Sequence, residues 1–205
     1  MSKDFEDLPF WTRPDLTPYL IHLTKNTIEQ DGFTAFDNLV EILKNGKLHA
    51  SNHTGFIKGP NKATCFMDVP FNALKYVLDE KNANPINPKY EPYGIFFTKK
   101  FAYKKSIRPV LYLSNSETKN LGIPKSELWR IVRFEVKNNE WISFLHEREW
   151  RCKGDFKLPN NPGVLVKTTR EYTELTELLK NQHEDFKVIP RTIIPLDIMC
   201  QGLFV

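Results

Sequence analysis

Residues 34–46 read Thr-Ala-Phe-Asp-Asn-Leu-Val-Glu-Ile-Leu-Lys-Asn-Gly, and this stretch goes furthest towards deciding the fold. Its apolar residues fall on one face at helical spacing, which predicts an amphipathic helix over residues 36–45. Thr34 is suited to cap the open amides of the first turn, and Gly46 is typical of the residue that ends a helix. The chain therefore contains at least one well-marked helix, and the flanking patterns decide what accompanies it.

Outward from this helix the dominant pattern is strand-like. Residues 19–24 (Tyr-Leu-Ile-His-Leu-Thr) alternate in the manner of a half-buried strand, whereas residues 25–33 are typical of a loop. Further short strands are predicted at residues 63–69, 94–98, 109–113, the later part of 127–136, 149–152, 164–167, 187–189 and 192–194. Two more helices are predicted, over residues 71–79 and 170–181. Many short strands with few helices indicate an α+β domain.

The length and composition fit one folded domain. The chain has 205 residues, of which 40% are hydrophobic and 26% are charged, and both values are ordinary for a globular protein. We expect an extended arm over residues 1–18 and a single domain over residues 19–205. The three cysteines, Cys65, Cys152 and Cys200, are widely spaced. No CxxC pair or other metal-ligand spacing occurs, so neither a disulfide framework nor a bound metal is expected.

Several functional classes lack their motifs in this sequence. It has no GxxxxGK[ST], GxGxxG, HExxH or GxSxG pattern and no His/Cys cluster with metal-ligand spacing, which argues against a P-loop enzyme and a metalloenzyme. It shows neither a secretory signal nor an apolar run long enough to span a bilayer. We therefore expect a cytoplasmic protein with no membrane association.

The charge pattern leaves nucleic-acid binding open. The formal net charge is +4 and the isoelectric point is about 8.8, so the chain is mildly basic. Five of its 29 lysines and arginines fall within residues 99–108. Such a run is consistent with a solvated loop between two strands, or with a patch that follows phosphates at the rim of a site. The second interpretation assigns nucleic-acid binding to Lys99, Lys100, Lys104 and Lys105.

Polar residues interrupt three of the predicted strands. His22 and Thr24 would point to the same face of the first strand, where His22 is either a core histidine bonded to a neighbouring carbonyl or a ligand-binding group. Asp68 lies near the end of its strand, and this position is more typical of a turn cap than of a catalytic group. Glu147 and Glu149 would share a face, either in a surface ladder of charges or as carboxylates at the lip of a cleft.

The order of these pieces resembles that of known families. The pieces are His22-Leu-Thr24, Asp-Asn-Leu-Val-Glu-Ile-Leu-Lys-Asn-Gly-Lys-Leu at 37–48, Cys-Phe-Met-Asp-Val-Pro at 65–70, Tyr-Gly-Ile-Phe-Phe-Thr-Lys at 93–99, and Glu-Arg-Glu-Trp-Arg at 147–151. The series resembles the AbiGi-type abortive-infection proteins. Its first two pieces and its late glutamate are also similar to the DarT-type DNA ADP-ribosyltransferases. The resemblance covers about residues 19–155.

This resemblance implies an NAD site near the first strand. In ADP-ribosyltransferases of this group, a His-x-Thr or His-x-Ser strand holds NAD. By that likeness His22 would bond a ribose, the backbone of Leu23 would grip the nicotinamide amide, and Thr24 would fix the end of the strand. Asn38, from the Asp-Asn-Leu that opens the helix, would help to line the pocket. The arginine that DarT-type enzymes keep near the pyrophosphate has no clear counterpart.

The same resemblance assigns the chemistry to two glutamates. Glu149 matches the catalytic glutamate of the group, and Glu147 matches the accessory position that places an acceptor. Breaking the nicotinamide–ribose bond builds positive charge on the sugar, which a fixed carboxylate stabilises, and the same carboxylate can take a proton from the nucleophile. The resemblance thus implies an ADP-ribosyltransferase-like split, curved sheet with flanking helices, NAD as co-substrate, and transfer to a macromolecule, with nucleic acid (RNA or DNA) ahead of protein.

Two other functions remain open at this point. The first is a non-catalytic interaction or antitoxin protein of an abortive-infection system; a toxin of the same kind would in turn have a cognate antitoxin protein as partner. The second is a nuclease that places Asp68, Glu149 and a lysine around magnesium, although residues 149–151 offer an arginine where a Glu-x-Lys is needed.

Overall fold

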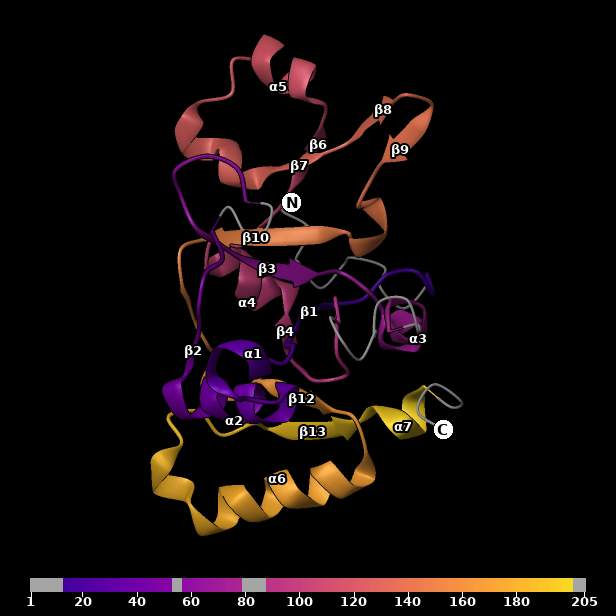
Figure 1. The fold of residues 1–205 in the computed structure, drawn as a ribbon. Coiled ribbons are helices and arrows are strands. Elements are labelled where there is room, and N and C mark those ends of the chain that lie inside the picture. Colours follow the sequence, from indigo (N-terminus) through magenta and orange to yellow (C-terminus); the bar gives the residue numbers. More distant parts are fainter. Residues whose placement is uncertain (1–12, 53–56, 79–87, 201–205) are drawn as a thin grey trace, which may run out of the picture.

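The computed structural model describes residues 13–52, 57–78 and 88–200. Its centre is a seven-stranded sheet with strand order β13–β12–β4–β1–β3–β10–β5 (Figure 1). Neighbouring strands are antiparallel apart from the parallel pair β12–β13. These strands are β1 (Tyr19–Leu23), β3 (Ala63–Met67), β4 (Gly94–Thr98), β5 (Arg108–Pro109), β10 (Glu149–Lys153), β12 (Gly163–Val166) and β13 (Thr192–Pro195).

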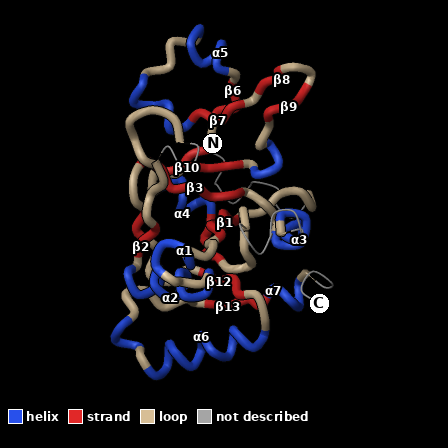
Figure 2. The backbone as a smooth tube through the Cα atoms, in the orientation of Figure 1, coloured by secondary structure: helices blue, strands red, loops and turns tan. Residues whose placement is uncertain are grey.

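Helices and smaller strand pairs surround this sheet (Figure 2). The helices are α1 (Ile28–Asp31), α2 (Ala35–Asn45), α3 (Leu74–Val77), α4 (Lys99–Lys104), α5 (Asn115–Asn120), α6 (Thr169–Asn181) and α7 (Leu196–Met199), with 3-10 turns η3 (Phe71–Ala73), η4 (Lys125–Arg130), η5 (Leu145–Glu147) and η6 (His183–Asp185). The two-stranded pairs are β2 (Lys47–Leu48) with β11 (Phe156–Lys157), β6 (Leu111–Leu113) with β7 (Ile131–Arg133), and β8 (Glu135–Lys137) with β9 (Glu140–Ile142). The architecture is thus mixed α+β, as predicted. In the described part of the chain, no helix combines the length and the apolar character needed to cross a bilayer.

The sheet buries a hydrophobic core on each of its two faces, because successive residues of a strand point to opposite sides. One face, here called the α2 face, carries Leu20 and Phe66 and packs against Leu39 of α2. The other, the α3 face, carries Ile21 and Met67 and packs against α3 and α7. A side chain on the central strands therefore belongs to one face or the other, and this alternation decides which functional candidates can meet.

The best-predicted element is α2, because its local signals agree with one another. The side chain of Thr34 accepts a hydrogen bond from the amide of Asp37, and Asp37 bonds back to the amide of Thr34, so both ends of a capping box are present. Gly46 ends the helix in the left-handed conformation, φ 64°, in which a Cβ is unfavourable. Helix α6 and the strands β1, β3, β4, β10, β12 and β13 also lie where the sequence predicts them, to within two residues at each end.

Several predicted segments differ from the structure. Residues 25–33 are not all loop, because a single helical turn, α1, forms there and Gly32 closes it. Residues 187–189 form no strand; the amide of Val188 instead bonds the carbonyl of Leu43, so this segment covers the end of α2. The strand expected at 109–113 is divided between β5 and β6, and the helix expected at 71–79 is a 3-10 turn followed by α3.

Two expectations fall partly or wholly outside the described residues. The arm expected over residues 1–18 is described only from residue 13, and position 79, the last of one predicted helix, lies in the gap between 78 and 88. The single-domain boundary at residue 19 coincides with the first residue of β1. The N-terminal arm and the single domain over residues 19–205 remain predictions.

Candidate active site

Glu149 is the first residue of β10 and lies opposite Met67 of β3, so its side chain belongs to the α3 face. It is 7% exposed. Arg151 lies two residues further on and shares that face. Its Nε donates to Oε1 of Glu149 at 2.7 Å and its Nη2 donates to Oε2 at 3.0 Å. This bidentate pairing fixes the orientation of the carboxylate and keeps it next to a permanent cation.

Further contacts hold this pair in place. Arg151 is 4% exposed, and its Nη1 donates to the carbonyl of Trp129 at 2.7 Å. Burial opposes the charged form of Arg151, but the hydrogen bonds and charge of Glu149 outweigh burial and raise the pKa of the guanidinium. The amide of Glu149 donates to the phenolic oxygen of Tyr112 at 3.0 Å. Both ends of the pair are thereby anchored to backbone or side-chain partners.

Glu147 lies close to this pair, at the end of η5. Its Oε1 accepts hydrogen bonds from the hydroxyl of Tyr90 and from Nζ of Lys89, the latter at 2.8 Å. Burial, and then the negative charge of Glu147, raise the pKa of Tyr90. Burial, and then the charge of Glu149, likewise raise the pKa of Cys65. Because Tyr90 and Cys65 each sense both glutamates, the two carboxylates and these two residues form one neighbourhood on the α3 face.

The residue between the two glutamates points elsewhere. Arg148 has φ 46°, in the left-handed region, which turns its side chain away from its neighbours. Its Nη1 donates to the carbonyl of Asp15, and its Nη2 lies 3.7 Å from Oδ1 of Asp68. Because of this turn, the guanidinium of Arg148 is directed at Asp68 and away from the carboxylates of Glu147 and Glu149.

His22 lies on the α2 face, with its ring 5.9 Å from that of Phe66. Its Nδ1 is 2.8 Å from the carbonyl of Cys65, and since a carbonyl only accepts, Nδ1 carries the proton and donates it. Burial lowers the pKa of His22, so the ring is neutral and Nε2 is an acceptor. The contact is that of a core histidine bonded to a neighbouring carbonyl. His22 and Glu149 lie on opposite faces of the sheet, so the structure does not bring these two side chains together.

The other residues of the predicted NAD strand surround the end of β1. Leu23 lies opposite Gly94 of β4 and shares the α3 face with Glu149. The Oγ1 of Thr24 donates to the carbonyl of Ala35 at 3.1 Å, so Thr24 ties the end of β1 to the start of α2. Asn38 of α2 donates through Nδ2 to the carbonyl of Lys25 and to Oγ1 of Thr27, both at 2.9 Å. Their part in holding NAD remains a prediction.

The predicted lysine patch needs a correction at Lys99. This residue is 6% exposed, and its Nζ lies 2.8 Å from Oδ1 of Asp68, within 6.0 Å of the ring centre of Trp150. It is buried because residues 99–104 form helix α4 instead of a solvated loop, and the first turn of α4 packs on the sheet. Lys99 is therefore not part of a surface patch. The α4 lysines, defined here as Lys100, Lys104 and Lys105, are exposed, and their binding to nucleic acid remains a prediction.

Asp68 is likewise not a simple turn cap. It pairs with Lys99 and accepts a hydrogen bond from Nε1 of Trp150 at 3.3 Å, on the side of the sheet away from Glu149. The nuclease hypothesis needs Asp68 and Glu149 to meet at one ion, and their positions on different faces contradict it. Among residues 13–52, 57–78 and 88–200, no three His, Cys, Asp or Glu side chains are grouped closely enough to hold a metal.

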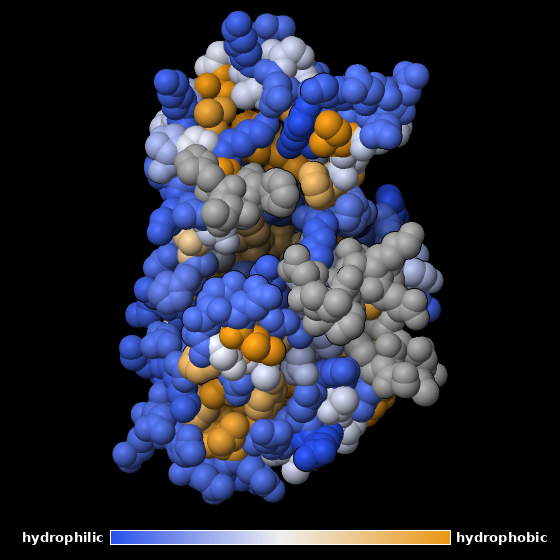
Figure 3. Space-filling model, viewed as in Figure 1, coloured by the Kyte–Doolittle hydropathy of each residue, from blue (hydrophilic) through white to orange (hydrophobic). Residues whose placement is uncertain are grey.

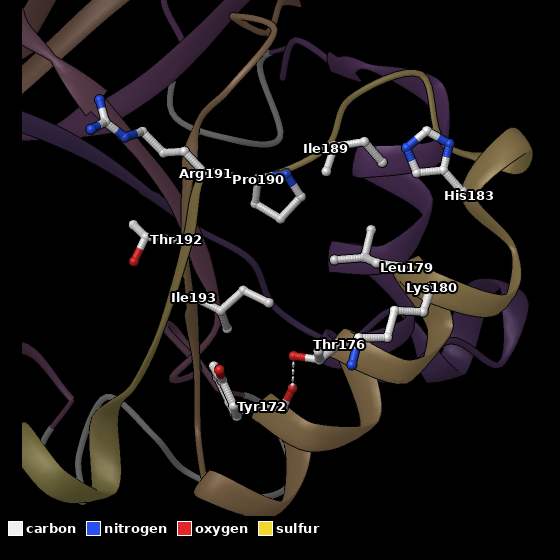
Figure 4. A pocket seen from close by; sticks show the side chains of 10 residues that line it. All are labelled: Tyr172, Thr176, Leu179, Lys180, His183, Ile189, Pro190, Arg191, Thr192 and Ile193. Atoms are coloured by element: carbon white, nitrogen blue, oxygen red, sulfur yellow. Dashed lines mark hydrogen bonds between the residues drawn. The ribbon is translucent and has the colours of Figure 1, made fainter.

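The surface is hollowed over β3 and β10, above α1, on the side shown in Figure 3. A pocket of about 530 Å³ is lined in part by His146, Arg148 and Asp68, and neither Glu147 nor Glu149 is among its lining residues. A second pocket, of about 600 Å³, lies between α6 and β13, where Lys180 and Tyr172 project from the helix (Figure 4). Helix α6 lies at the lower end of the molecule, with most of the sheet between it and β10 (Figure 1), so this second pocket is separate from the glutamate neighbourhood.

Some site residues escaped the sequence analysis. Tyr90 and Lys89 follow a Pro- and Asn-rich stretch without periodicity, and nothing in the sequence pairs them with Glu147. The pairing of Glu149 with Arg151 did have a signal, because residues i and i+2 of a strand share a face. The sequence places Arg151 near the two glutamates without pairing it with either one. In the structure Arg151 is the main partner of Glu149.

Comparison with known proteins gives two structural neighbours. No known family profile matches the chain, and no curated protein matches it. Two solved structures do: "Thermus sp. 2.9 DarT in complex with ADP-ribosylated ssDNA", at 17% identity and a TM-score of 0.48, and "Thermus sp. 2.9 DarT in complex with carba-NAD+", at 16% and 0.47. Each alignment covers 88% of this chain, and 95% and 96% of the respective neighbour. Both neighbours are DarT.

Proposed function

We propose that this protein is an NAD-dependent mono-ADP-ribosyltransferase that transfers ADP-ribose to a nucleic acid, RNA or DNA, with Glu149 as its catalytic residue and Glu147 as the accessory. The proposal includes the finer assignment of the sheet to the split, curved ADP-ribosyltransferase fold. It also includes a cytoplasmic toxin or phage-defence role of the AbiGi type, in which a cognate antitoxin protein is a possible partner. These assignments come from the motif resemblance and from the arrangement of the glutamates.

The observation that carries the proposal is the fixed, buried carboxylate of Glu149 next to Glu147 on one face of the sheet. Glu149 is 7% exposed, and its orientation is held by two hydrogen bonds from Arg151. A carboxylate that is already oriented and poorly solvated stabilises developing positive charge without having to reorganise.

The residues around Glu149 suit the nicotinamide end of NAD, and we assign no residue to its other end. Bound NAD would supply a sugar carbon that becomes positively charged as nicotinamide leaves. Glu149 would oppose that charge and take the proton of the incoming nucleophile, and Glu147 would position the acceptor. Leu23 shares the face of Glu149, so its neighbourhood suits the nicotinamide end. His22 projects from the other face, so we assign it no contact with this sugar; it holds the carbonyl of Cys65 and thereby keeps β3 beside β1.

Release of nicotinamide from NAD tests this proposal without knowledge of the acceptor. The parent protein should release nicotinamide, and Glu149→Gln should slow the release by about 100- to 1,000-fold, which is typical when one electrostatic interaction with a transition state is removed. Glu174→Gln is the matched control, since Glu174 is an exposed residue of α6 at the other end of the molecule. Equal rates for Glu149→Gln and the parent would refute the assignment of Glu149.

One observation favours a second candidate, a non-catalytic interaction protein. Both carboxylate oxygens of Glu149 are already engaged by Arg151, and the guanidinium offsets much of the negative charge that the chemistry requires. The two candidates differ in the parent protein itself. An interaction protein binds its partner but releases no nicotinamide from NAD at any acceptor concentration.

A further inference from the structure

The strand pair β8–β9 forms a hairpin that stands out from the body of the molecule at the upper right of Figure 1, and η5 connects it to β10. Its strands pair Val136 with Trp141 and Lys137 with Glu140. The connecting residues Asn138 and Asn139 have φ 53° and 63°, as in the tight two-residue turns that match the twist of a hairpin. The hairpin is thus a defined element, and its projecting side chains have fixed positions on two faces.

One of these faces is aromatic and uncovered. Val136 is 56% exposed and Trp141 is 67% exposed, and as cross-strand partners they lie side by side. Phe134 packs against Trp141, with its ring centre 5.2 Å from that of Trp141 and the two planes tilted by 31°. Within the described ranges, no aromatic ring other than Phe134 contacts Trp141. A large apolar side chain held this way is costly to leave in water, so the surface suits a flat apolar ligand.

The hairpin leads directly to the glutamates. Glu147 follows Trp141 by six positions, and the chain between them passes through Phe144. Nζ of Lys89 lies 5.2 Å from the ring centre of Phe144 and 2.8 Å from Oε1 of Glu147. Aromatic surface and cationic charge therefore continue from Trp141 towards the carboxylates, and Lys137 adds a further cation at the turn.

We propose that Trp141, supported by Phe134, is a stacking platform for an unpaired nucleobase of the acceptor. This inference rests on the proposed function, whose acceptor it specifies. Every base has a π-face that stacks on an indole ring, whatever the sequence, whereas in a duplex both faces are covered by neighbouring pairs. Lys137, exposed at the turn of the hairpin, supplies counter-charge to the backbone of such a strand. From a base seated on Trp141, the adjoining nucleotides would run along the segment that leads to Glu147, which we assign to the acceptor.

Fluorescence anisotropy with a short labelled single-stranded DNA, in the absence of NAD, tests the platform. Trp141→Ala should weaken binding about 5- to 150-fold, the range expected when one base can no longer stack. Trp141→Phe should retain most of the affinity, and the same strand annealed to its complement should bind more weakly than the single strand. The control is Tyr172→Ala, which removes another exposed ring, on α6, and should bind as the parent does.

Three results would overturn the platform. In the first two, the parent does not bind the single strand, or Trp141→Ala binds it as the parent does. In the third, light scattering shows that the parent is a dimer and that Trp141→Ala is a monomer. The last result would assign the aromatic face to a second copy of this chain. A parent that binds the strand through Trp141 but releases no nicotinamide would refute the transferase and leave the platform standing, so the two failures are distinguishable. Because Trp141 is exposed, Trp141→Ala should fold normally, and circular dichroism checks this.

Discussion

Breaking the buried pair Glu149–Arg151 should destabilise the fold as well as change the chemistry. Glu149→Gln keeps the shape of the side chain but leaves the guanidinium of Arg151, 4% exposed, without a counter-charge. Removing one partner of a buried ion pair costs on the order of 3–5 kcal/mol. Since an amide oxygen still accepts one hydrogen bond from Arg151, we expect the lower end, about 3 kcal/mol.

This free energy has a measurable consequence in thermal unfolding. For a domain of this size each kcal/mol lowers the melting temperature by about 2–4 °C, so Glu149→Gln should melt about 6–12 °C below the parent. The control is Lys47→Gln, which breaks the ion pair of Lys47 with Asp155, 3.0 Å apart with both side chains more than 40% exposed. Exposed pairs contribute less than about 1 kcal/mol, so this variant should melt close to the parent.

The double variant Glu149→Gln/Arg151→Met removes both charges of the pair and so tests whether the lost stability of Glu149→Gln comes from the unpaired charge of Arg151. With both charges removed, no buried charge is left unpaired, so the double variant should be more stable than Glu149→Gln alone. Melting temperatures from circular dichroism, together with denaturant titrations, measure all four proteins. The reasoning is refuted if Glu149→Gln unfolds within about 1 kcal/mol of the parent, because the pair would then not be the structural unit that its burial indicates.

Three further predictions follow from the same structure. Burial lowers the pKa of His22 below the 6.5 of a free histidine, so the unfolded chain takes up a proton that the folded chain resists. Stability should be full above pH 6.5 and fall as the pH drops below it; in denaturant titrations His22→Gln should flatten that fall, whereas the exposed His183→Gln should keep it. Replacing the α4 lysines with Glu should weaken oligonucleotide binding. The slope of log affinity against log salt should become shallower by about 0.7 for each phosphate that the protein no longer neutralises. An unchanged slope would mean that these lysines form only a solvated helix face. Glu147→Gln should slow transfer to the acceptor more than it slows nicotinamide release, and equal decreases in the two rates would remove its accessory role.

Local signals predicted the regular elements well where several of them agree. The helix 36–45 carries its apolar stripe, its capping threonine and its terminal glycine in sequence, and α2 forms with all three. Helix α4 was missed because its six residues include three lysines, so its polar composition masks the apolar contacts of Phe101 and Ala102. Its real start signal is Thr98, whose side chain caps the amide of Phe101, and such a cap is easily missed directly after an apolar strand.

The site was harder to predict, because it depends on register. Alternation places His22 on one face of β1 and Glu149 on one face of β10, but only the pairing of β3 with both strands decides whether those faces coincide. Met67 lies opposite Ile21 and also opposite Glu149, so Glu149 shares the face of Ile21 and not that of His22. No property of either segment alone contains that information. The same holds for Lys99, because its ion-pair partner Asp68 lies some thirty residues earlier in the chain.

The most direct test of the central claim is transfer of ADP-ribose to a nucleic acid. Purified protein is mixed with NAD and single-stranded DNA or RNA, below the melting temperature of every variant, and the mass of the oligonucleotide is followed over time. The parent should add one ADP-ribose to a strand, and Glu149→Gln should lose this activity while the Glu174→Gln control keeps it. An oligonucleotide that stays unmodified in every reaction, together with intact NAD, would contradict the transferase and favour the interaction protein. Full transfer by Glu149→Gln would instead contradict the assignment of the chemistry to Glu149.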